Sequence, residues 1–474
     1  MTAKARIRAI DRFIKGCRED GIYDDLQAAC VMAGWDSLAG ALTPLKGAAP
    51  TNNGLSVYDR GGIGIAGDGT SYLNTNRLNS SDGQEDKHLA CFVTSPNLST
   101  GENVIGSLVR SPSLSVSQIY VGGVGSPSAI YINSSTFNTL TYDGSAGLFG
   151  ASRTGTDLTA RVSGVSSTLS SVTNGNHALP TYVFCRNDAG TANSFCDGSI
   201  AFFSIGSATD LALLDARVST LMADLRAIEE TGFDRDALAY IRAVEAADGA
   251  YLETSVKIAI NNLVAGLKAD GLWDAIGSSC LLCGPRTLAG ALVPLRGDAP
   301  TAYGFVDGDY SRTDGITGDG TSYLDSNRAG NSDPQNDSHA AFYITTQATV
   351  GSEFLSNRDT DVTAGYISVG TNLTDFFFRF KSTGFGTVSG MHTGFVGMSR
   401  SLAASFTARC SGSNSTISNT SGSVSSNSVL VFDRQNTSAA TDATLAFYSI
   451  GTAINLAKLD THISSYVTAI GEAL

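Results

Sequence analysis

The chain has 474 residues, of which 42% are hydrophobic and only 16% are charged, and it contains 52 glycines. This length is too great for one hydrophobic core and predicts two domains, and the composition favours β-sheets joined by many turns over helical bundles. The net charge of −13 argues against nucleic acid or an anionic membrane as partner, because phosphate contacts need clustered Lys and Arg.

Neither a leader nor a membrane span is expected. Met1 to Ile10 carries charges where a secretory signal would be apolar, and the longest apolar runs fall well short of the roughly 20 residues that cross a bilayer. Most of the eight cysteines lack a counterpart in the other half of the chain: Cys17 faces Leu267 and Cys185 faces Asp433. A disulfide framework would repeat with the fold, so we expect reduced, buried thiols in a protein made in a cytoplasm.

In chain order, the first expected feature is a helical hairpin. Ile7, Ile10, Phe13, Ile14 and Cys17 fall at helical spacing, and Asp20-Gly21 ends that helix. The residues that follow predict a second helix ending near Gly34; they are Ile22, Tyr23, Leu26 and Cys30. The second half repeats the pattern at an offset of 250, with Ile260, Leu263, Val264 and Leu267, then Asp270-Gly271, then Leu272, Trp273 and Ile276.

A shared connector follows the hairpin. It reads Leu-Ala-Gly-Ala-Leu at positions 38–42 and again at 288–292, with matched prolines behind it at 44, 50, 294 and 300. Because proline cannot continue a helix, we expect an ordered, extended crossing that holds the hairpin to the sheet.

The next repeated stretch is a tight turn. Gly67-Asp68-Gly69-Thr70-Ser71-Tyr72-Leu73 with Asn76-Arg77 recurs as residues 318–324 with Asn327-Arg328, nine identical positions at an offset of 251. Glycine adopts positive φ freely and aspartate hydrogen-bonds to its own backbone, so Gly-Asp-Gly predicts a turn, and Tyr-Leu begins a strand.

Short apolar or alternating runs between turns occupy the following stretch of each half and predict an antiparallel sandwich. The best-matched run, Ser199 to Gly206 and Thr444 to Gly451, is expected to be a central strand, and each half then ends in an amphipathic helix. We place the boundary near Glu229 to Gly232, which divides the chain into a first repeat at 1–230 and a second, with an additional helix at Phe233 to Gly249, at 231–474.

Taken together, these motifs resemble tailed-bacteriophage virion proteins that carry concanavalin A-like (laminin G-like) sandwiches. The motifs are the Asp-Gly-Ile/Leu-Tyr/Trp hairpin, the Leu-Ala-Gly-Ala-Leu connector, the Gly-Asp-Gly-Thr turn with Asn-Arg, and the closing Phe-Phe/Tyr-Ser-Ile-Gly strand. The resemblance covers nearly the whole chain, once per repeat. It implies two tandem jelly-roll domains and a structural or appendage role, with carbohydrate contact in some relatives.

Enzymatic chemistry is not expected. A glycosidase of this fold needs two carboxylates facing one sugar, commonly in a Glu-x-Asp-x-Glu run, and the sequence has no such run. His88 and His339 match across the repeats without a Gly-x-Ser-x-Gly setting, so structural histidines bonded to backbone are favoured over a triad. Cys280 and Cys283 have CxxC spacing without a second pair, and buried helix cysteines are favoured over a zinc or redox site.

Two kinds of binding site stay open as alternatives. Asp68 and Asp319 are candidate calcium ligands, although one matched acid per turn is few for an ion that takes six to eight oxygens, and a turn-forming role is favoured. The candidate glycan contacts are Tyr72, Asn76, Arg77, Tyr323, Asn327 and Arg328; against them stands the interpretation that the arginines bond strand-end carbonyls. Tyr58 and Tyr310 are further aromatics that could stack on sugar rings.

From the residues and the resemblance together, we predict a non-enzymatic virion component, either a capsid decoration or a part of the tail or fibre, without a cofactor. Its expected partners are other virion proteins in a homo- or hetero-oligomeric particle. The alternative is a carbohydrate-binding adhesin that recognises host surface glycans. The loops differ between the repeats (Leu98 to Ser113 against Val350 to Thr363, for example), which favours docking on different neighbours over two equivalent glycan readers.

Overall fold

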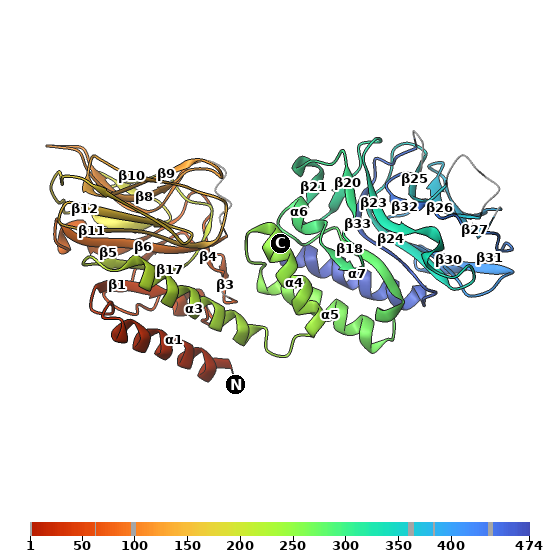
Figure 1. Ribbon diagram of the computed structural model, residues 1–474, viewed down its shortest axis with the longest axis horizontal. Helices are drawn as coiled ribbons and strands as arrows, with labels where there is room; N and C mark the ends of the chain where they lie inside the picture. Colours follow the sequence, from red (N-terminus) through yellow and green to blue (C-terminus); the bar gives the residue numbers. More distant parts are fainter. Residues whose placement is uncertain (1, 62, 96–100, 359–364, 383, 435–438) are drawn as a thin grey trace. The chain divides into compact units, whose positions relative to one another are not determined.

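A computed structural model describes residues 2–61, 63–95, 101–358, 365–382, 384–434 and 439–474 (Figure 1). The chain divides into two compact units, residues 1–232 with 249–254 and residues 233–248 with 255–474. Each unit is a sandwich of two sheets with helices packed on one of them. The predicted mainly-β sandwich architecture is confirmed. No helix in the described part of the chain is long and apolar enough to cross a membrane.

In unit 1 the two sheets are named A and B. Sheet A has the order β13-β12-β11-β6-β17-β4-β3, with β1 also beside β17. Its strands are β1 Leu26–Val31, β3 Tyr58–Asp59, β4 Gly64–Ala66, β6 Asp86–Ser95, β11 Gly147–Thr154, β12 Asp157–Val162, β13 Val165–Ser170 and β17 Ser199–Gly206. Sheet B has the order β10-β9-β8-β7-β14-β5-β2, with β15 parallel to β7. Its strands are β2 Thr51–Asn53, β5 Tyr72–Leu78, β7 Glu102–Val109, β8 Ser115–Val121, β9 Pro127–Ser134, β10 Asn138–Thr141, β14 Pro180–Val183, β15 Arg186–Asp188 and β16 Thr191–Asn193.

Unit 2 repeats this plan in sheets C and D. Sheet C runs β19-β18-β33-β24-β29-β30-β31, with β22 and β21 beside β33. Its strands are β18 Ile276–Leu281, β19 Pro294–Arg296, β21 Tyr310–Ser311, β22 Gly315–Thr317, β24 Ser338–Thr346, β29 Gly394–Arg400, β30 Ser405–Cys410, β31 Ser413–Ser418 and β33 Thr444–Gly451. Sheet D runs β20-β23-β32-β25-β26-β27-β28. Its strands are β20 Thr301–Tyr303, β23 Tyr323–Ala329, β25 Ser352–Ser356, β26 Tyr366–Thr371, β27 Asp375–Ser382, β28 Gly386–Ser389 and β32 Ser428–Val431.

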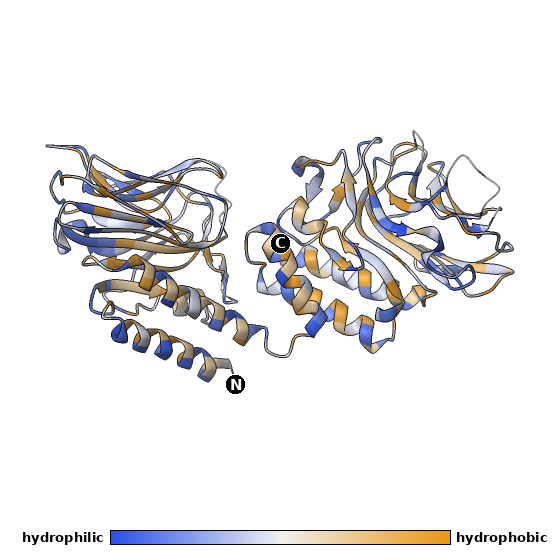
Figure 2. Cartoon of the chain, in the orientation of Figure 1, coloured by the Kyte–Doolittle hydropathy of each residue, from blue (hydrophilic) through white to orange (hydrophobic). Residues whose placement is uncertain are grey.

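Helices cover the outer side of the first sheet of each unit. In unit 1 they are α1 Thr2–Glu19 and α3 Leu211–Glu229, with the short α2 Leu38–Ala41 and the 3-10 turn η1 Asn79–Ser81 in the connections. Unit 2 has α4 Arg235–Asp248, α5 Thr254–Ala269, α6 Leu288–Ala291 and α7 Leu456–Ala473, with 3-10 turns η2 Trp273–Ala275, η3 Asp307–Asp309 and η4 Gly330–Ser332. Hydrophobic and hydrophilic residues mix along these helices, as expected of elements with one buried face (Figure 2).

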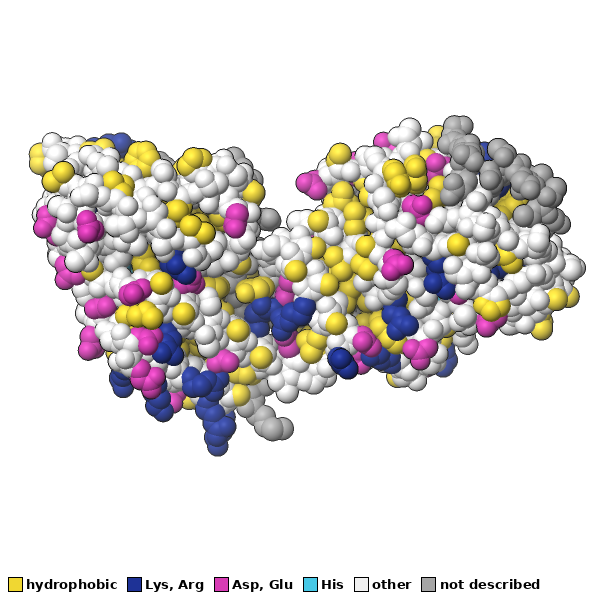
Figure 3. Space-filling model, viewed as in Figure 1, with side chains coloured by type: hydrophobic (Ala, Val, Ile, Leu, Met, Phe, Trp, Pro, Cys, Tyr) yellow, Lys and Arg dark blue, Asp and Glu magenta, His cyan; other side chains and the backbone are white. Residues whose placement is uncertain are grey.

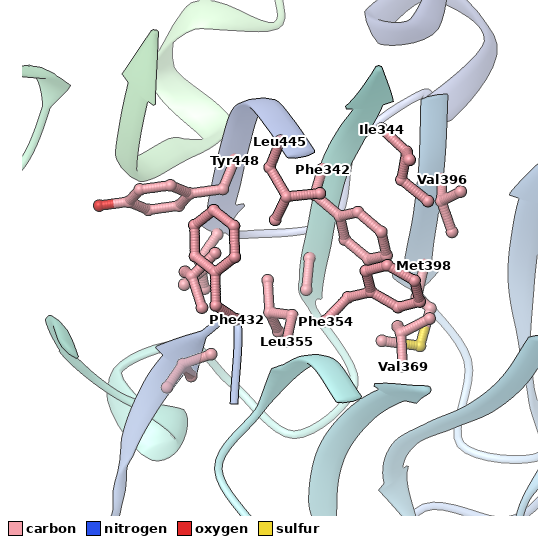
Figure 4. Close-up of a cluster of buried hydrophobic side chains, with 14 of the residues drawn as sticks. Phe342, Ile344, Phe354, Leu355, Val369, Val396, Met398, Phe432, Leu445 and Tyr448 are labelled. Carbon is pink, nitrogen blue, oxygen red and sulfur yellow. The ribbon is translucent and has the colours of Figure 1, made fainter. Parts of the chain in front are cut away.

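The closing strands β17 and β33 are buried at every position, as expected for central strands. Alternate side chains of β17 go to two different cores: Phe203 joins the interior of the sandwich, whereas Phe202 packs under the helices, with its ring 5.9 Å from that of Phe13. In unit 2, Phe342, Phe354, Leu445 and Tyr448 belong to the interior of the sandwich, where side chains from the two sheets point toward one another (Figure 4).

The segment predicted as the second helix of the hairpin is a strand in both units. Strands β1 and β18 occupy it, and each pairs antiparallel with the closing strand of its unit. The prediction was wrong because this run is buried on both sides, by the sandwich core and by the helices, so its apolar residues do not alternate. For the same reason Cys280 lies in a strand and Cys283 just beyond it, not on a helix.

The connector after this strand begins with a short helix, which we expected the prolines to exclude. Ser37 Oγ caps α2 and Thr287 Oγ caps α6, each accepting from a glycine N–H at 3.2 Å. Pro44 and Pro294 lie beyond these helices and only prevent their continuation, so the prediction of a wholly extended crossing was wrong at its start. The remainder is extended, with Leu45 N bonded to Ala29 O of β1 at 2.8 Å.

The aromatic residue of the hairpin motif joins the first helix to this connector. The centre of the Tyr23 ring lies 4.8 Å from the Arg18 guanidinium and 4.5 Å from the Lys46 ammonium. The equivalent cluster of unit 2 consists of Lys268, Trp273 and Arg296. An aromatic ring attracts a cation on either face, so one side chain ties both segments together.

Each sandwich also contains one fully buried arginine that the sequence analysis missed. Arg153 donates to the carbonyls of Ile132, at 3.0 Å, and Ser171, at 2.8 Å. Arg400 is its equivalent and donates to Phe380 O and Asn419 O at 2.8 and 3.0 Å. These bonds satisfy carbonyls that the end of the sheet would otherwise leave unpaired.

The eight cysteines are all buried and carry free thiols. On the face shown in Figure 3, charged side chains occupy a minor part of the surface, in keeping with the low charged fraction of the sequence.

Replacing Phe202 with Ala should lower the free energy of unfolding of unit 1 by about 3–5 kcal/mol, because the ring is fully buried between sheet A and the helices. Phe447→Ala is the matched change in β33 and should lower the stability of unit 2 by a similar amount. Chemical denaturation with both transitions resolved measures each effect. A cost below about 1 kcal/mol would contradict this packing.

Candidate functional site

The repeated Gly-Asp-Gly turns use their carboxylates internally. Asp68 Oδ1 accepts from Thr70 N at 2.8 Å and Ser71 N at 2.6 Å, and Oδ2 accepts from Ser71 Oγ at 2.6 Å. Partial burial raises the pKa of Asp68, but these bonds outweigh it and lower the pKa to about 2. Asp319 makes the matching bonds to Thr321 and Ser322, which lower its pKa to about 2. Both calcium candidates therefore have a turn-forming role, and the described residues contain no group of three or more His, Cys, Asp or Glu side chains that could hold a metal ion.

The Asn-Arg pair after each turn is also used within the scaffold. Asn76 adopts a positive φ of 57° and donates from Nδ2 to Ala49 O at 2.9 Å, which fixes the end of the connector. Arg77 forms an ion pair with the largely buried carboxylate of Asp82, with Nε 3.0 Å from Oδ2. The expectation that these arginines bond strand-end carbonyls was wrong for Arg77, whereas Arg328 Nη1 also donates to Gly277 O near the start of β18 at 3.5 Å. Asn327, Ala299, Arg328 and Asp333 repeat both arrangements in unit 2.

The tyrosines considered as sugar platforms are mostly engaged with neighbours. The Tyr72 ring lies 4.6 Å from that of Tyr182, and the Tyr323 ring stacks on Tyr303 at 4.7 Å. Tyr58 OH donates to Trp35 O at 2.9 Å, and Tyr310 OH donates to Pro285 O at 2.6 Å. All four candidates are only partly exposed.

The matched histidines are structural, as predicted. His88 is fully buried; its Nδ1 lies 2.6 Å from Ser207 O and its Nε2 lies 3.0 Å from Ser204 Oγ. His339 repeats this with Thr452 O and Ser449 Oγ. Although each is a Ser–His pair, both ring nitrogens are occupied and no solvent reaches them, so a substrate has no access. Burial raises the pKa of Cys280 and of Cys283 to about 12, which leaves them as unreactive thiols.

A cavity of about 460 Å³ in unit 1 is lined mainly by hydroxyl groups between the β11–β13 strands and the start of α3. Its Ser152 Oγ accepts from Thr209 N at 3.0 Å and donates to Thr209 O at 2.9 Å. In unit 2, Ser399 Oγ accepts from Ile454 N at the same joint between sheet and helix. We therefore assign this cavity to the scaffold.

A second cavity, of about 320 Å³, lies on the outer face of sheet D in unit 2. We call it the sheet D pocket; it is lined by Glu353, Arg358, Tyr366, Ser368, Phe377, Arg379 and Phe385. Strand alternation produces it: Phe376, Phe378 and Phe380 of β27 enter the core, so Phe377 and Arg379 face outward.

The aromatic and charged groups of this pocket contact one another. Phe377 and Phe385 meet edge to face with ring centroids 5.8 Å apart, and Phe385 is 59% exposed. The Arg379 guanidinium lies 4.4 Å from the centre of the Tyr366 ring and 6.0 Å from that of Phe385. Aromatic side chains beside a few polar groups in a concavity are typical of small-ligand sites.

Unit 1 carries an exposed aromatic pair at the equivalent place. Strand pairing defines the equivalence: Gly386 pairs with Phe378, and Asn138 pairs with Ile130, so Phe385 corresponds to Phe137. Phe137 is 46% exposed, and its ring lies 5.2 Å from that of Tyr131, which faces outward from β9. The two units thus share an exposed phenylalanine on the outer face of the second sheet, and in each unit it contacts a second, partly exposed aromatic ring.

The sequence analysis missed this pair because it compared the halves at offsets of 250 and 251. Phe137 and Phe385 differ by 248 positions, since the intervening loops differ in length, and their partners Tyr131 and Phe377 lie at neighbouring outward positions of their strands. Alternation along 375–380 and 127–132 was the available signal, but it does not tell which apolar residues stay exposed.

No protein-family model and no curated protein sequence matches the chain. Among solved structures, it is similar to the mouse laminin α1 chain domains LG4-5, with 8% identity over 86% of this chain and 92% of that chain, at a TM-score of 0.23. It is also similar to the Ruminococcus gnavus IT-sialidase CBM40 (10% identity, 30% and 85% covered, TM-score 0.24). A third is domain 4 of AbnA, a GH43 arabinanase from Geobacillus stearothermophilus, in complex with arabinotriose (12%, 35% and 82%, 0.25). Similarities of this size do not indicate what this chain binds.

The stability of each unit should fall as the pH decreases from 6.5 toward about 4. Burial lowers the pKa of His88 and of His339 from 6.5 to about 4, so the folded state resists a proton that the unfolded state accepts. This contribution is complete above pH 6.5 and is lost as the pH falls, at about 1.4 kcal/mol per pH unit for each histidine.

Urea unfolding at several pH values measures the slope, and His88→Gln should reduce it for unit 1 by about one proton. His177, whose pKa burial also lowers to about 4, supplies a remaining part of the slope. His392→Gln, at an exposed position, is the control. An unchanged slope in His88→Gln would contradict the assignment.

Proposed function

We propose that this chain is a non-enzymatic carbohydrate-binding protein in which each unit presents a binding face on the outer side of its second sheet. The observation that carries the proposal is the exposed phenylalanine at equivalent positions of the two units, Phe137 and Phe385, each in contact with a second, partly exposed aromatic ring, Tyr131 and Phe377 respectively. Exposed phenylalanine is costly in water, and its recurrence at one place on both sandwiches favours a common use.

The chemistry of a sugar ring suits this face. A pyranose presents patches of C–H between its hydroxyl groups, so it packs on an aromatic ring while the hydroxyls bond polar neighbours. Such neighbours are present: Ser368 and Glu353 line the sheet D pocket, and Gln118 and Arg186 lie on the same face of sheet B.

The number of carboxylates in the sheet D pocket favours binding of a sugar over its hydrolysis. Glu353 is the one carboxylate among the described residues that line the sheet D pocket, whereas glycoside hydrolysis uses two. Glu353 accepts a hydrogen bond from Ser368 Oγ and lies 4.0 Å from Arg358 and 3.6 Å from Arg434. These partners engage the oxygens of Glu353 and fix its position within the scaffold.

The face is tested with the full chain on a glycan array, followed by affinity measurements on the glycans retained. Phe385→Ala and Phe137→Ala should each weaken binding by about tenfold at their own unit, because each removes one stacking surface. Leu402→Ala and Val172→Ala are the controls, since both are exposed apolar residues (62% and 74%) outside the two faces. Retention of no glycan, or equal binding by all variants, would overturn the proposal.

We further propose that the chain performs this binding as part of a bacteriophage virion, as a capsid decoration or a tail or fibre component packed against other virion proteins. Support for this setting comes from the sequence motifs, which resemble virion proteins. An adhesin mounted on a particle would combine both roles. Mass spectrometry of purified particles from the source phage should detect the chain at a fixed ratio to the capsid protein, and its absence from the particles would exclude the setting.

A further inference from the structure

Arg379 lines the sheet D pocket, and among the described residues its guanidinium N–H groups have no hydrogen-bond acceptor. Its guanidinium stacks on Tyr366 and lies near Phe385, yet within the described part of the chain it has neither a hydrogen bond nor an ion pair. Stacking fixes the plane of a guanidinium and leaves its N–H groups directed outward along the edge. Such an edge matches the two oxygens of a carboxylate or a sulfate.

The carboxylate of the pocket, that of Glu353, does not form an ion pair with Arg379. The Glu353 carboxylate is already compensated by Arg358 and Arg434 and by the hydroxyl of Ser368. Among the described residues, the lining comprises two arginines and one glutamate, a local positive excess in a chain whose net charge is −13. A surplus cation beside aromatic rings favours a ligand with both an apolar face and an anionic group.

The described residues of the equivalent face of unit 1 include no such cation. Arg379 pairs across the strands with Ser368, and in unit 1 the corresponding pair is Tyr131 with Gln118, so a tyrosine stands where unit 2 has the arginine. The nearby Arg186 is committed, with Nη1 3.1 Å from Gln118 Oε1 and Nη2 3.0 Å from Asp188 Oδ2. The two faces share an aromatic pair but differ in charge.

We infer that the sheet D pocket binds an acidic sugar residue, whose ring packs on the Phe377–Phe385 pair and whose carboxylate or sulfate is bound by Arg379, whereas the unit 1 face takes a neutral sugar. This inference rests on the proposed carbohydrate binding. The two units then bind sugars of different charge, and Arg379 is the residue that determines the specificity of unit 2.

The test uses the full chain and pairs of polymers that differ in charge alone. Polygalacturonate and its carboxyl-reduced form make one pair, and dextran sulfate and dextran make the other, so the two pairs separate carboxylate from sulfate recognition. Affinity electrophoresis and titration calorimetry measure binding. At least one acidic polymer should bind at least tenfold more tightly than its neutral partner, and more weakly as salt rises.

The variants isolate the arginine. Arg379→Gln should weaken binding of the acidic polymer at least tenfold without changing binding of neutral glycans by the unit 1 face, and Arg379→Lys should retain part of the affinity. Arg8→Gln, at an exposed position of α1, controls for the change in net charge. Thermal unfolding of each variant verifies that it is folded, and Arg379→Lys serves if the glutamine variant is not.

Several results would overturn the inference. If the neutral polymers bind as tightly as the acidic ones and Phe385→Ala weakens both, the proposed carbohydrate binding stands and the preference for an acidic sugar falls. If Arg379→Gln loses no more affinity than Arg8→Gln, the attraction is general charge and Arg379 is not the determinant. If no polymer binds and the glycan array is empty, the proposed function falls as well.

Discussion

The structure depends on one constraint: the closing strand of each unit is buried on both faces. Strands β17 and β33 supply side chains to the sandwich interior and to a helical layer at the same time. A sheet with two apolar faces must be covered on both, so sheets A and C require their helices, and α1 and α3 meet that need in unit 1. The long helices pack on sheets A and C, and on the outer faces of sheets B and D Phe137 and Phe385 remain 46% and 59% exposed.

This constraint explains why the most strongly repeated residues belong to the scaffold. Asp68, Asn76, Arg77 and His88 each satisfy backbone groups or a buried charge at a joint between the sheets, the connector and the turns. An unsatisfied polar group at such a joint costs free energy in either unit, so both units keep the same solution. Repetition within a chain therefore marks what folding needs, and it is a poor guide to what binding needs.

On the outer faces of sheets B and D, equivalent positions of the two units need not keep the same residue. A ligand-contacting position need only point outward from its strand, so its identity can change between the units while its geometry is kept. Phe137 and Phe385 keep both geometry and type, whereas Tyr131 and Arg379 keep only the outward position. A common sandwich can in this way present two faces that share a stacking surface and differ in charge.

Two segments formed a different secondary structure from the one that their residue pattern predicted. The run Leu26–Val31 has apolar residues at helical spacing, yet it forms β1, because its neighbours in space are β17 and the helices. The short α2 lies in a segment where Pro44 was expected to exclude a helix, but a proline excludes helical structure at its own position and disfavours it at the residue before it, and both positions lie beyond the end of α2 at Ala41. Tertiary burial overrode the helical pattern of β1, and for α2 the predicted position of the helix boundary was wrong by a few residues.

The sequence by itself determined the duplication, the mainly-β architecture, the Gly-Asp-Gly turns, the closing strands and helices, and the structural role of His88 and His339. These features depend on local chemistry: turn residues with special backbone freedom, alternation of apolar side chains, and motifs repeated at one register. The tertiary structure alone decided the partner of Arg77, the strand at Leu26–Val31 and the position of the sheet D pocket. The physical reason for the strand is that β1 is buried by β17 and by helices, and β17 and α3 lie far from it in the chain, so residue spacing does not record those contacts. Arg77 and its partner Asp82 are only five residues apart, but the η1 turn between them sets the direction of both side chains, and the spacing alone does not give that direction.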